Sequence, residues 1–136
     1  MTWLAALLSA LLAIPALLHL LWALGIWLPL RDETALARAV VGAKDVTRMP
    51  PAIPCAVVAM ALTFAAVLPH RPAFPLHTPF MLLCTVVFTL RGAATYLPAW
   101  RRIVPQQPFA TLDRSCYGPL CLLLGAGFFI TTLTGA

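Results

Sequence analysis

Long runs of apolar residues alternate with short polar segments along the chain, and this pattern predicts the fold class. The apolar runs cover about residues 2–28, 52–68, 78–97 and 117–134. A helix needs roughly 20 mainly apolar residues to cross a bilayer, and the bilayer can thin around the shorter second run. Prolines flank the runs, where they either start or end a helix. We therefore expect an all-α fold, an antiparallel bundle of four transmembrane helices.

The composition supports a membrane protein rather than a soluble one. Hydrophobic residues make up 62% of the 136 residues, and charged residues make up 10%, whereas a soluble domain carries about 25% charged residues. A chain this short has too small an interior to hide so much apolar surface from water. No composition shift marks a second domain, so residues 1–136 are expected to form a single integral membrane domain.

Basic residues are distributed unevenly between the loops, and this predicts the direction of each span. The loops after the first and third spans hold seven Lys and Arg residues, whereas the loop after the second span holds only Arg71. Because loops rich in Lys and Arg stay in the cytoplasm, both termini are expected to lie on the opposite side of the membrane. The lipid bilayer is the expected partner of the basic loops. Nucleic acid is not, because no basic stripe interleaves with aromatic residues.

The first loop is expected to contain a short interfacial helix at about residues 32–41. Asp32 can cap its N-terminus, and Gly42 is a stop signal. Ala35, Leu36, Ala39 and Val40 form an apolar stripe along it, as in helices that lie in the membrane surface.

A few ionisable residues lie inside or beside the apolar runs, where they are costly and usually face the protein interior. His19 in the first span and Arg91 in the third should both lie in the cytoplasmic half of the membrane, and Asp113 and Tyr117 stand at the start of the fourth. Trp22 is one helical turn from His19. These five residues are the candidate ligand-binding site, and Arg91 is expected to pair with Asp113. A purely structural role for this polar cluster remains open.

Several kinds of chemistry find no support in the sequence. The four cysteines form no C-x-x-C pair, and His70 and His77 share a proline-rich loop with no carboxylate or thiol, so no metal site is predicted. Phosphate-binding, zinc-protease, serine-hydrolase and dinucleotide motifs are absent from the sequence. The sequence points to no cofactor and does not decide whether the protein is an enzyme.

Three sequence segments together resemble a known family. They are HLLWALGIW (residues 19–27), LRG (residues 90–92) and FATLDRSCYGPLCLLLG (residues 109–125). The chain resembles a family of small bacterial membrane proteins catalogued as a domain of unknown function, number thirty-nine ninety-five. The resemblance covers nearly the whole chain, and residues 113–121 are its most specific part. It implies the four-helix architecture and a bacterial inner membrane, in which both termini are expected to be periplasmic, but no activity.

Three functional hypotheses follow from these observations. The first is a small membrane protein whose cytoplasmic-half polar cluster binds a small molecule or lipid. The second is an accessory subunit that packs against a larger membrane complex, with another membrane protein or a second copy of the chain as partner. The third is a membrane-embedded enzyme that uses His19 as its acid or base. An enclosed pocket that holds both His19 and Arg91 would favour the first or third, and a lipid-facing stripe of polar or small residues would favour the second.

Overall fold

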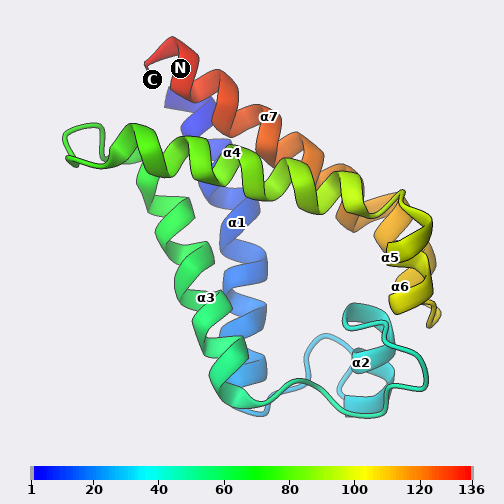
Figure 1. Cartoon of the computed structure of the whole chain (residues 1–136). Coiled ribbons are helices and arrows are strands. Elements are labelled where there is room, and N and C mark those ends of the chain that lie inside the picture. Colours follow the sequence, from blue (N-terminus) through cyan, green and yellow to red (C-terminus); the bar gives the residue numbers. More distant parts are fainter. Residues whose placement is uncertain (1, 136) are drawn as a thin grey trace.

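The computed structural model describes residues 2–135, which form helices and connecting turns with no strand (Figure 1). The elements are α1 (Thr2–Ala23), α2 (Glu33–Val40), α3 (Ala52–Val67), the 3-10 turn η1 (Leu68–His70), α4 (His77–Ala94), α5 (Pro98–Ile103), α6 (Phe109–Leu112), the π-helical segment η2 (Asp113–Tyr117) and α7 (Gly118–Thr134). Four stretches are long and apolar enough to cross a membrane: Trp3–Ala23, Ala52–His70, His77–Ala94 and Phe109–Thr134. The all-α membrane-helix class predicted from the sequence is confirmed.

The four long helices form two pairs rather than one compact core. Helix α1 packs along α3, and α4 packs along α7. The pairs meet where α1 begins and α7 ends, and they diverge away from that point (Figure 1). The meeting point is a hydrophobic cluster drawn from all four helices and η1: Leu8, Leu12, Ala65, Leu68, Met81, Leu124 and Phe128. The apolar contact between the pairs is therefore concentrated at one end of the molecule.

Small residues allow α4 and α7 to approach closely. A Cβ atom added to Gly125 would lie 2.4 Å from Thr89 Oγ1 and 3.0 Å from the Thr89 backbone nitrogen. A Cβ atom on Gly92 would lie 2.8 Å from the carbonyl oxygen of Gly118. Helices in membranes associate through such close backbone packing, because lipid provides little hydrophobic force between them. The α4–α7 pair consequently has little tolerance for larger side chains at these positions.

Three helix boundaries differ from the predicted ones. Helix α1 ends at Ala23 rather than near residue 28, because Gly25 adopts a left-handed φ of 78°. Helix α4 ends at Ala94, since Leu97 is extended before Pro98 (φ −85°, ψ 136°), as a residue before proline prefers. The last helical stretch begins at Phe109, eight residues before the predicted start at residue 117. Asp113 therefore lies within this stretch rather than before it.

Helix α2 joins the diverging ends of the two pairs. Its N-cap is Asp32, whose Oδ2 accepts a hydrogen bond from the Ala35 backbone nitrogen at 2.8 Å. Gly42 follows it with a φ of 74°, and a Cβ atom there would overlap the ring of Phe109 at 2.1 Å. The Gln106 backbone nitrogen also donates to the carbonyl of Gly42 at 3.0 Å. The first loop is thus attached to the segment that leads into α7.

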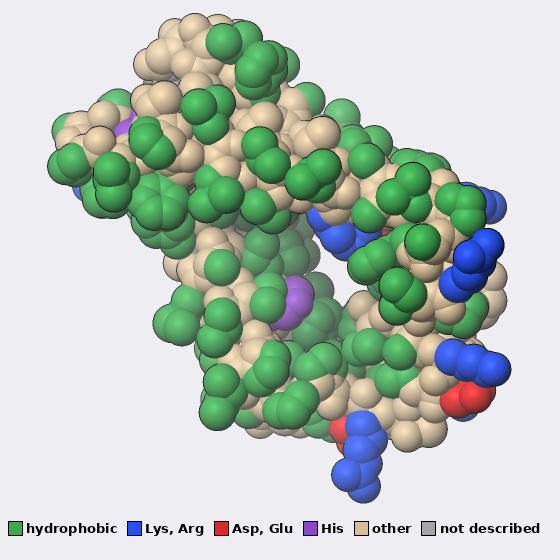
Figure 2. All heavy atoms as spheres, in the orientation of Figure 1, with side chains coloured by type: hydrophobic (Ala, Val, Ile, Leu, Met, Phe, Trp, Pro, Cys, Tyr) green, Lys and Arg blue, Asp and Glu red, His purple; other side chains and the backbone are tan. Residues whose placement is uncertain are grey.

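An open gap separates the two helix pairs (Figure 2). The pairs form two of its sides, and the α2 region and its contacts with α6 form the third (Figure 1). Most atoms at its edge belong to hydrophobic side chains, but a histidine lies on one wall and a basic side chain on the other (Figure 2). The fold therefore frames a mainly apolar space within the depth of the long helices.

Candidate functional site

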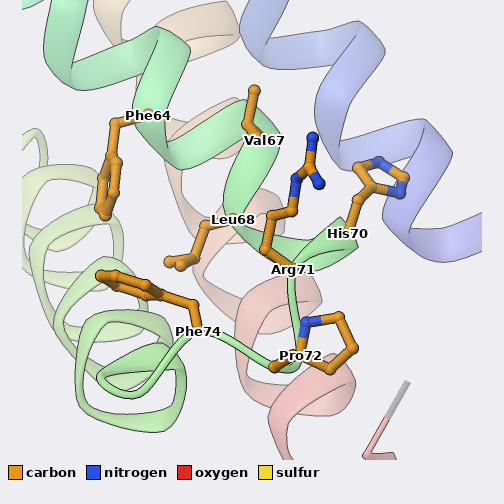
Figure 3. A pocket seen from close by; sticks show the side chains of 8 residues that line it. Phe64, Val67, Leu68, His70, Arg71, Pro72 and Phe74 are labelled. Carbon is orange, nitrogen blue, oxygen red and sulfur yellow. The ribbon is translucent and has the colours of Figure 1, made fainter.

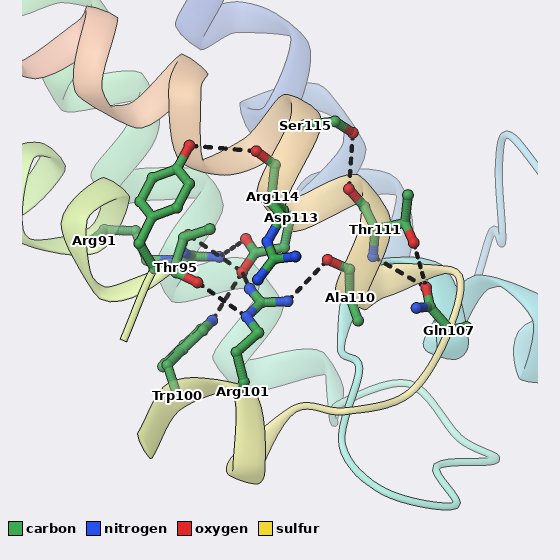
Figure 4. A network of polar contacts seen from close by, with 11 residues as sticks. Arg91, Thr95, Trp100, Arg101, Gln107, Ala110, Thr111, Asp113, Arg114 and Ser115 are labelled. Carbon is green, nitrogen blue, oxygen red and sulfur yellow. Dashed lines mark hydrogen bonds and ion pairs between the residues drawn. The ribbon is translucent and has the colours of Figure 1, made fainter. Parts of the chain in front are cut away.

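The π-helical segment η2 places Asp113 against the end of α4. A π turn widens the helix by one residue and is frequent at functional sites. Arg91 and Thr95 lie one turn apart at the end of α4, and Trp100 and Arg101 follow on α5, which begins at Pro98. These four side chains surround the Asp113 carboxylate (Figure 4). The end of α4, helix α5 and the segment η2 therefore meet at one acidic group.

The Asp113 carboxylate is fully buried and accepts four hydrogen bonds from side chains. Arg91 Nη2 donates to Oδ1 at 2.7 Å. Oδ2 accepts from Thr95 Oγ1 at 3.2 Å, from Trp100 Nε1 at 2.8 Å and from Arg101 Nη2. The predicted ion pair between Arg91 and Asp113 is confirmed. With four donors around it and no exposed surface, Asp113 is not accessible to a ligand.

The two arginines differ in how many of their donors are used. Arg101 makes three hydrogen bonds, to Asp113, to the Thr95 carbonyl at 2.9 Å and to the Ala110 carbonyl at 2.8 Å. Arg91 makes two, to Asp113 and to Thr95 Oγ1 at 2.9 Å, and stacks over the Trp100 ring at 4.7 Å. A guanidinium carries five N–H donors, and 31% of the Arg91 side chain is exposed. Arg91 therefore keeps donors available to a further acceptor.

The charges in this cluster do not balance. Two guanidinium groups contact one carboxylate, which leaves an excess positive charge at the end of α4. Partially buried charges are screened less by salt than exposed ones. The cluster can therefore attract an anion, and Arg91 is the group best placed to bind it.

His19 and Trp22 lie in a separate pocket, which corrects the expectation of one cluster containing all five residues. A cavity of about 120 Å³ is lined by His19, Trp22, Val40, Val41, Met49, Pro50, Pro54, Cys55 and Val58. Arg91, Asp113 and Tyr117 do not line it. The rings of His19 and Trp22 pack at 4.8 Å, and Trp22 Nε1 donates to the Leu28 carbonyl at 2.8 Å. The two helix pairs diverge at this depth, so His19 on α1 lies apart from Arg91 on α4 even though both are in the same half of their helices.

His19 gains no acidic partner from this arrangement. Its Nδ1 lies 2.7 Å from the Pro15 carbonyl oxygen and must donate to it, because a carbonyl only accepts. Among the described residues that line the cavity, the other ionisable group is the buried thiol of Cys55. The suggested acid or base role of His19 thus rests on the imidazole alone.

Tyr117 links the two regions, and its hydroxyl is not among the donors to Asp113. Its hydroxyl donates to the Ala39 carbonyl at 3.0 Å, and its ring packs against Phe109 at 5.7 Å. Ala39 belongs to α2, and the following residues, Val40 and Val41, line the His19 pocket. Tyr117 therefore positions the first loop against the start of α7 instead of binding with Arg91.

Three of the residues that contact Asp113 were not among the candidates predicted from the sequence: Thr95, Trp100 and Arg101. Arg101 is one of the seven basic loop residues that predict the topology, and that pattern alone gives it no partner. The positions of Trp100 and Arg101 depend on the short helix after Pro98. The available signal was a tryptophan and an arginine in the first turns after Pro98, which stand 13 and 12 residues before a lone aspartate.

Within residues 2–135, no group of side chains is arranged as a metal site, and the four cysteines form no disulfide. No three His, Cys, Asp or Glu side chains in this range gather closely enough to hold a metal ion. Cys55, Cys84, Cys116 and Cys121 are free thiols. The polar chemistry of the described chain is thus centred on the arginines and the imidazole.

The match to a family model decides where this chain belongs. Residues 11–128 match the family described as "Protein of unknown function (DUF3995)". The chain belongs to this family. No curated protein and no solved structure shows significant similarity to it. The matched residues include both the Asp113 cluster and the His19 pocket, so the family model extends over both candidate sites.

We expect Arg91→Ala and Asp113→Ala each to destabilise the detergent-solubilised protein. Breaking a buried ion pair costs about 3–5 kcal/mol, and the lower end applies because both arginines are partly exposed. The double variant should lose less than the sum, since the two side chains interact directly. Thermal melts of all four proteins give the coupling energy. Arg102→Ala, an exposed arginine on the same helix as Arg101, serves as control, and strict additivity would contradict the account.

Proposed function

We propose that this protein binds an anionic lipid in the gap between its helix pairs, with the headgroup at Arg91. The single observation that supports this most is the partly exposed guanidinium of Arg91, which has unused donors in a cluster with excess positive charge. The proposal places the protein in a bacterial inner membrane, with both termini in the periplasm.

The shape of the molecule favours a lipid as the occupant. A gap bounded mainly by hydrophobic side chains (Figure 2) is filled by acyl chains when it lies in a bilayer, because an empty space forfeits dispersion contacts on every side. The small cavity beside His19 and Trp22 adds an apolar recess on the α1–α3 side. A chain inserted between the pairs therefore replaces contacts that the diverging helices do not make with each other.

The chemistry at the end of α4 favours a negatively charged headgroup. Arginine forms bidentate hydrogen bonds with phosphate, and such charge-assisted bonds are about twice as strong as neutral ones. Arg91 is the basic residue in the last turn of α4. In the proposed topology this end faces the cytoplasmic leaflet, where anionic lipids create a negative surface potential.

An anionic lipid should stabilise the purified protein more than a zwitterionic one. We expect phosphatidylglycerol to raise the melting temperature by several degrees over the same amount of phosphatidylcholine, because bound ligand stabilises the folded state. Arg91→Gln should lose most of this difference, and Arg91→Lys should keep part of it. Arg102→Gln removes the same charge from an exposed residue on α5 and should keep the difference. Equal rises in melting temperature with both lipids would refute the site. An equal loss of the difference between the lipids in Arg91→Gln and Arg102→Gln would also refute it.

The proposed orientation of the protein in the membrane can be tested separately from lipid binding. A reporter that is active only in the periplasm should give signal when fused after Ala136, because seven of the eight basic loop residues lie in the odd loops. The same fusion made in the loop between α4 and α7 should be inactive. The reverse pattern would overturn the orientation.

A second function, as an accessory subunit of a membrane complex, is favoured by a groove on the α1–α3 pair. The groove has a volume of about 690 Å³, and its lining is rich in alanine: Ala13, Ala16, Ala56, Ala59 and Ala66. Alanines at a lipid-facing surface let another helix approach closely. This surface therefore suits a transmembrane helix of a partner protein.

A photo-crosslinking amino acid at Met60 tests this second function in the native membrane. Met60 lines the groove and is 66% exposed, and Leu90 on α4 is a matched control at 63%. A partner helix in the groove should give a defined adduct from position 60 and none from position 90. Lipid adducts at both positions would argue against an accessory role.

A further inference from the structure

The connection between α3 and α4 forms a pocket that is independent of the Arg91 cluster. Its volume is about 400 Å³, and its walls include Phe64, Val67, Leu68, His70, Arg71 and Phe74 (Figure 3). Ligand pockets typically measure about 300–1,000 Å³. Helix α4, about 27 Å long at 1.5 Å per residue, runs from this connection to the Arg91 cluster. The two sites therefore lie at opposite ends of α4.

The pocket is built on a backbone that is fixed by consecutive turns. The Arg71 nitrogen donates to the Leu68 carbonyl at 3.0 Å, the Phe74 nitrogen to the Arg71 carbonyl at 3.0 Å, and the His77 nitrogen to the Phe74 carbonyl at 2.9 Å. The Ser9 hydroxyl lies 2.8 Å from His70 Nε2 and holds that ring against α1. The walls are thus in place before a ligand enters, which lowers the ordering cost of binding.

The two sides of the pocket have different chemistry. Phe64 and Phe74 stand on one side, with ring centroids 6.4 Å apart, and both rings also pack against Phe80. They are 43% and 39% exposed, so their faces are not covered by the rest of the chain. Arg71 and His70 stand on the other side (Figure 3). Within residues 2–135, the ion pairs are those of Asp113, and the Arg71 guanidinium pairs with no carboxylate.

We propose that this pocket binds a single-chain amphipathic carboxylate, of the kind represented by a long-chain fatty acid. The aromatic side offers apolar contact to the chain, and Arg71 supplies the cation and the planar pair of donors that match a carboxylate. A loop at the end of two membrane helices places these groups where an amphiphile lies, with its head in water and its tail in lipid. The charge on Arg71 is complementary to one anionic head, and a volume of about 400 Å³, near the lower end of the range for ligand pockets, favours one chain over two.

Photo-labelling with a diazirine-bearing palmitic acid tests this site in phosphatidylcholine nanodiscs. Mass spectrometry should find the label on the peptide that contains residues 64–76. Arg71→Gln should reduce labelling there about tenfold, because it removes the charge-assisted hydrogen bonds between the guanidinium and the carboxylate. Arg71→Lys should retain part of the labelling, whereas Arg102→Gln, which removes the same charge from an exposed residue on α5, should leave it unchanged. Arg71 is exposed, so its variants should melt as the unmodified protein does.

Competition separates the carboxylate from other amphiphiles. Unlabelled palmitate should displace the probe, and hexadecanol, which has the same tail without the charge, should not. Equal competition by hexadecanol, or labelling that is unchanged in Arg71→Gln, would overturn the proposal. Displacement by phosphatidylglycerol as effective as that by palmitate would assign Arg71 to phospholipid headgroups and would also overturn it.

Discussion

The carboxylate of Asp113 is the interaction on which the α4–α7 half of this molecule depends. It is fully buried and accepts hydrogen bonds from Arg91 at the end of α4, from Trp100 and Arg101 on α5, and from Thr95 between them. A buried charge is tolerated only when it is paired and hydrogen-bonded. Because the donors come from the end of α4 and from the connection that precedes α7, satisfying one carboxylate also determines how that connection folds.

The position of this cluster sets the shape of the rest. The π-helical segment starts at Asp113 and ends at Tyr117, whose hydroxyl reaches the Ala39 carbonyl on α2. The same stretch brings Phe109 over Gly42. The two helix pairs share an apolar cluster at their other end, so these contacts hold them apart at the diverging end and keep the gap between them open. The excess positive charge of the cluster then lies at that end, and this is the basis for the proposed lipid.

Local signals in the sequence were sufficient for much of the fold. Apolar length predicted the four long helices, and Asp32 and Gly42 predicted the limits of α2, because capping and stop signals act within one turn. The Arg91–Asp113 pair was predictable because Asp113 is the only acidic residue outside the first loop. The α4–α7 contact involves Gly92, Gly118 and Gly125, which are small residues of the third and fourth apolar runs, and small residues let membrane helices approach closely.

Features that depend on tertiary arrangement were not predictable in the same way. Periodicity places His19 on a face of its helix but does not show how far one helix pair diverges from the other, so its separation from Arg91 was missed. The roles of Trp100 and Arg101 depend on a short helix in a loop, which has no apolar periodicity to reveal it. The π-helical turn at Asp113 arises where the widened backbone lets the carboxylate meet four donors at once.

Hydrogen exchange measured by mass spectrometry tests the central claim most directly, by comparing the unmodified protein with Asp113→Asn in the same nanodiscs. This substitution keeps the size of the side chain but removes its charge and part of its acceptor capacity. The account predicts faster exchange in residues 95–117, which the carboxylate organises, and unchanged exchange in the α1–α3 pair. Unchanged exchange in residues 95–117, or an equal increase along the whole chain, would contradict the claim that Asp113 organises this half of the molecule.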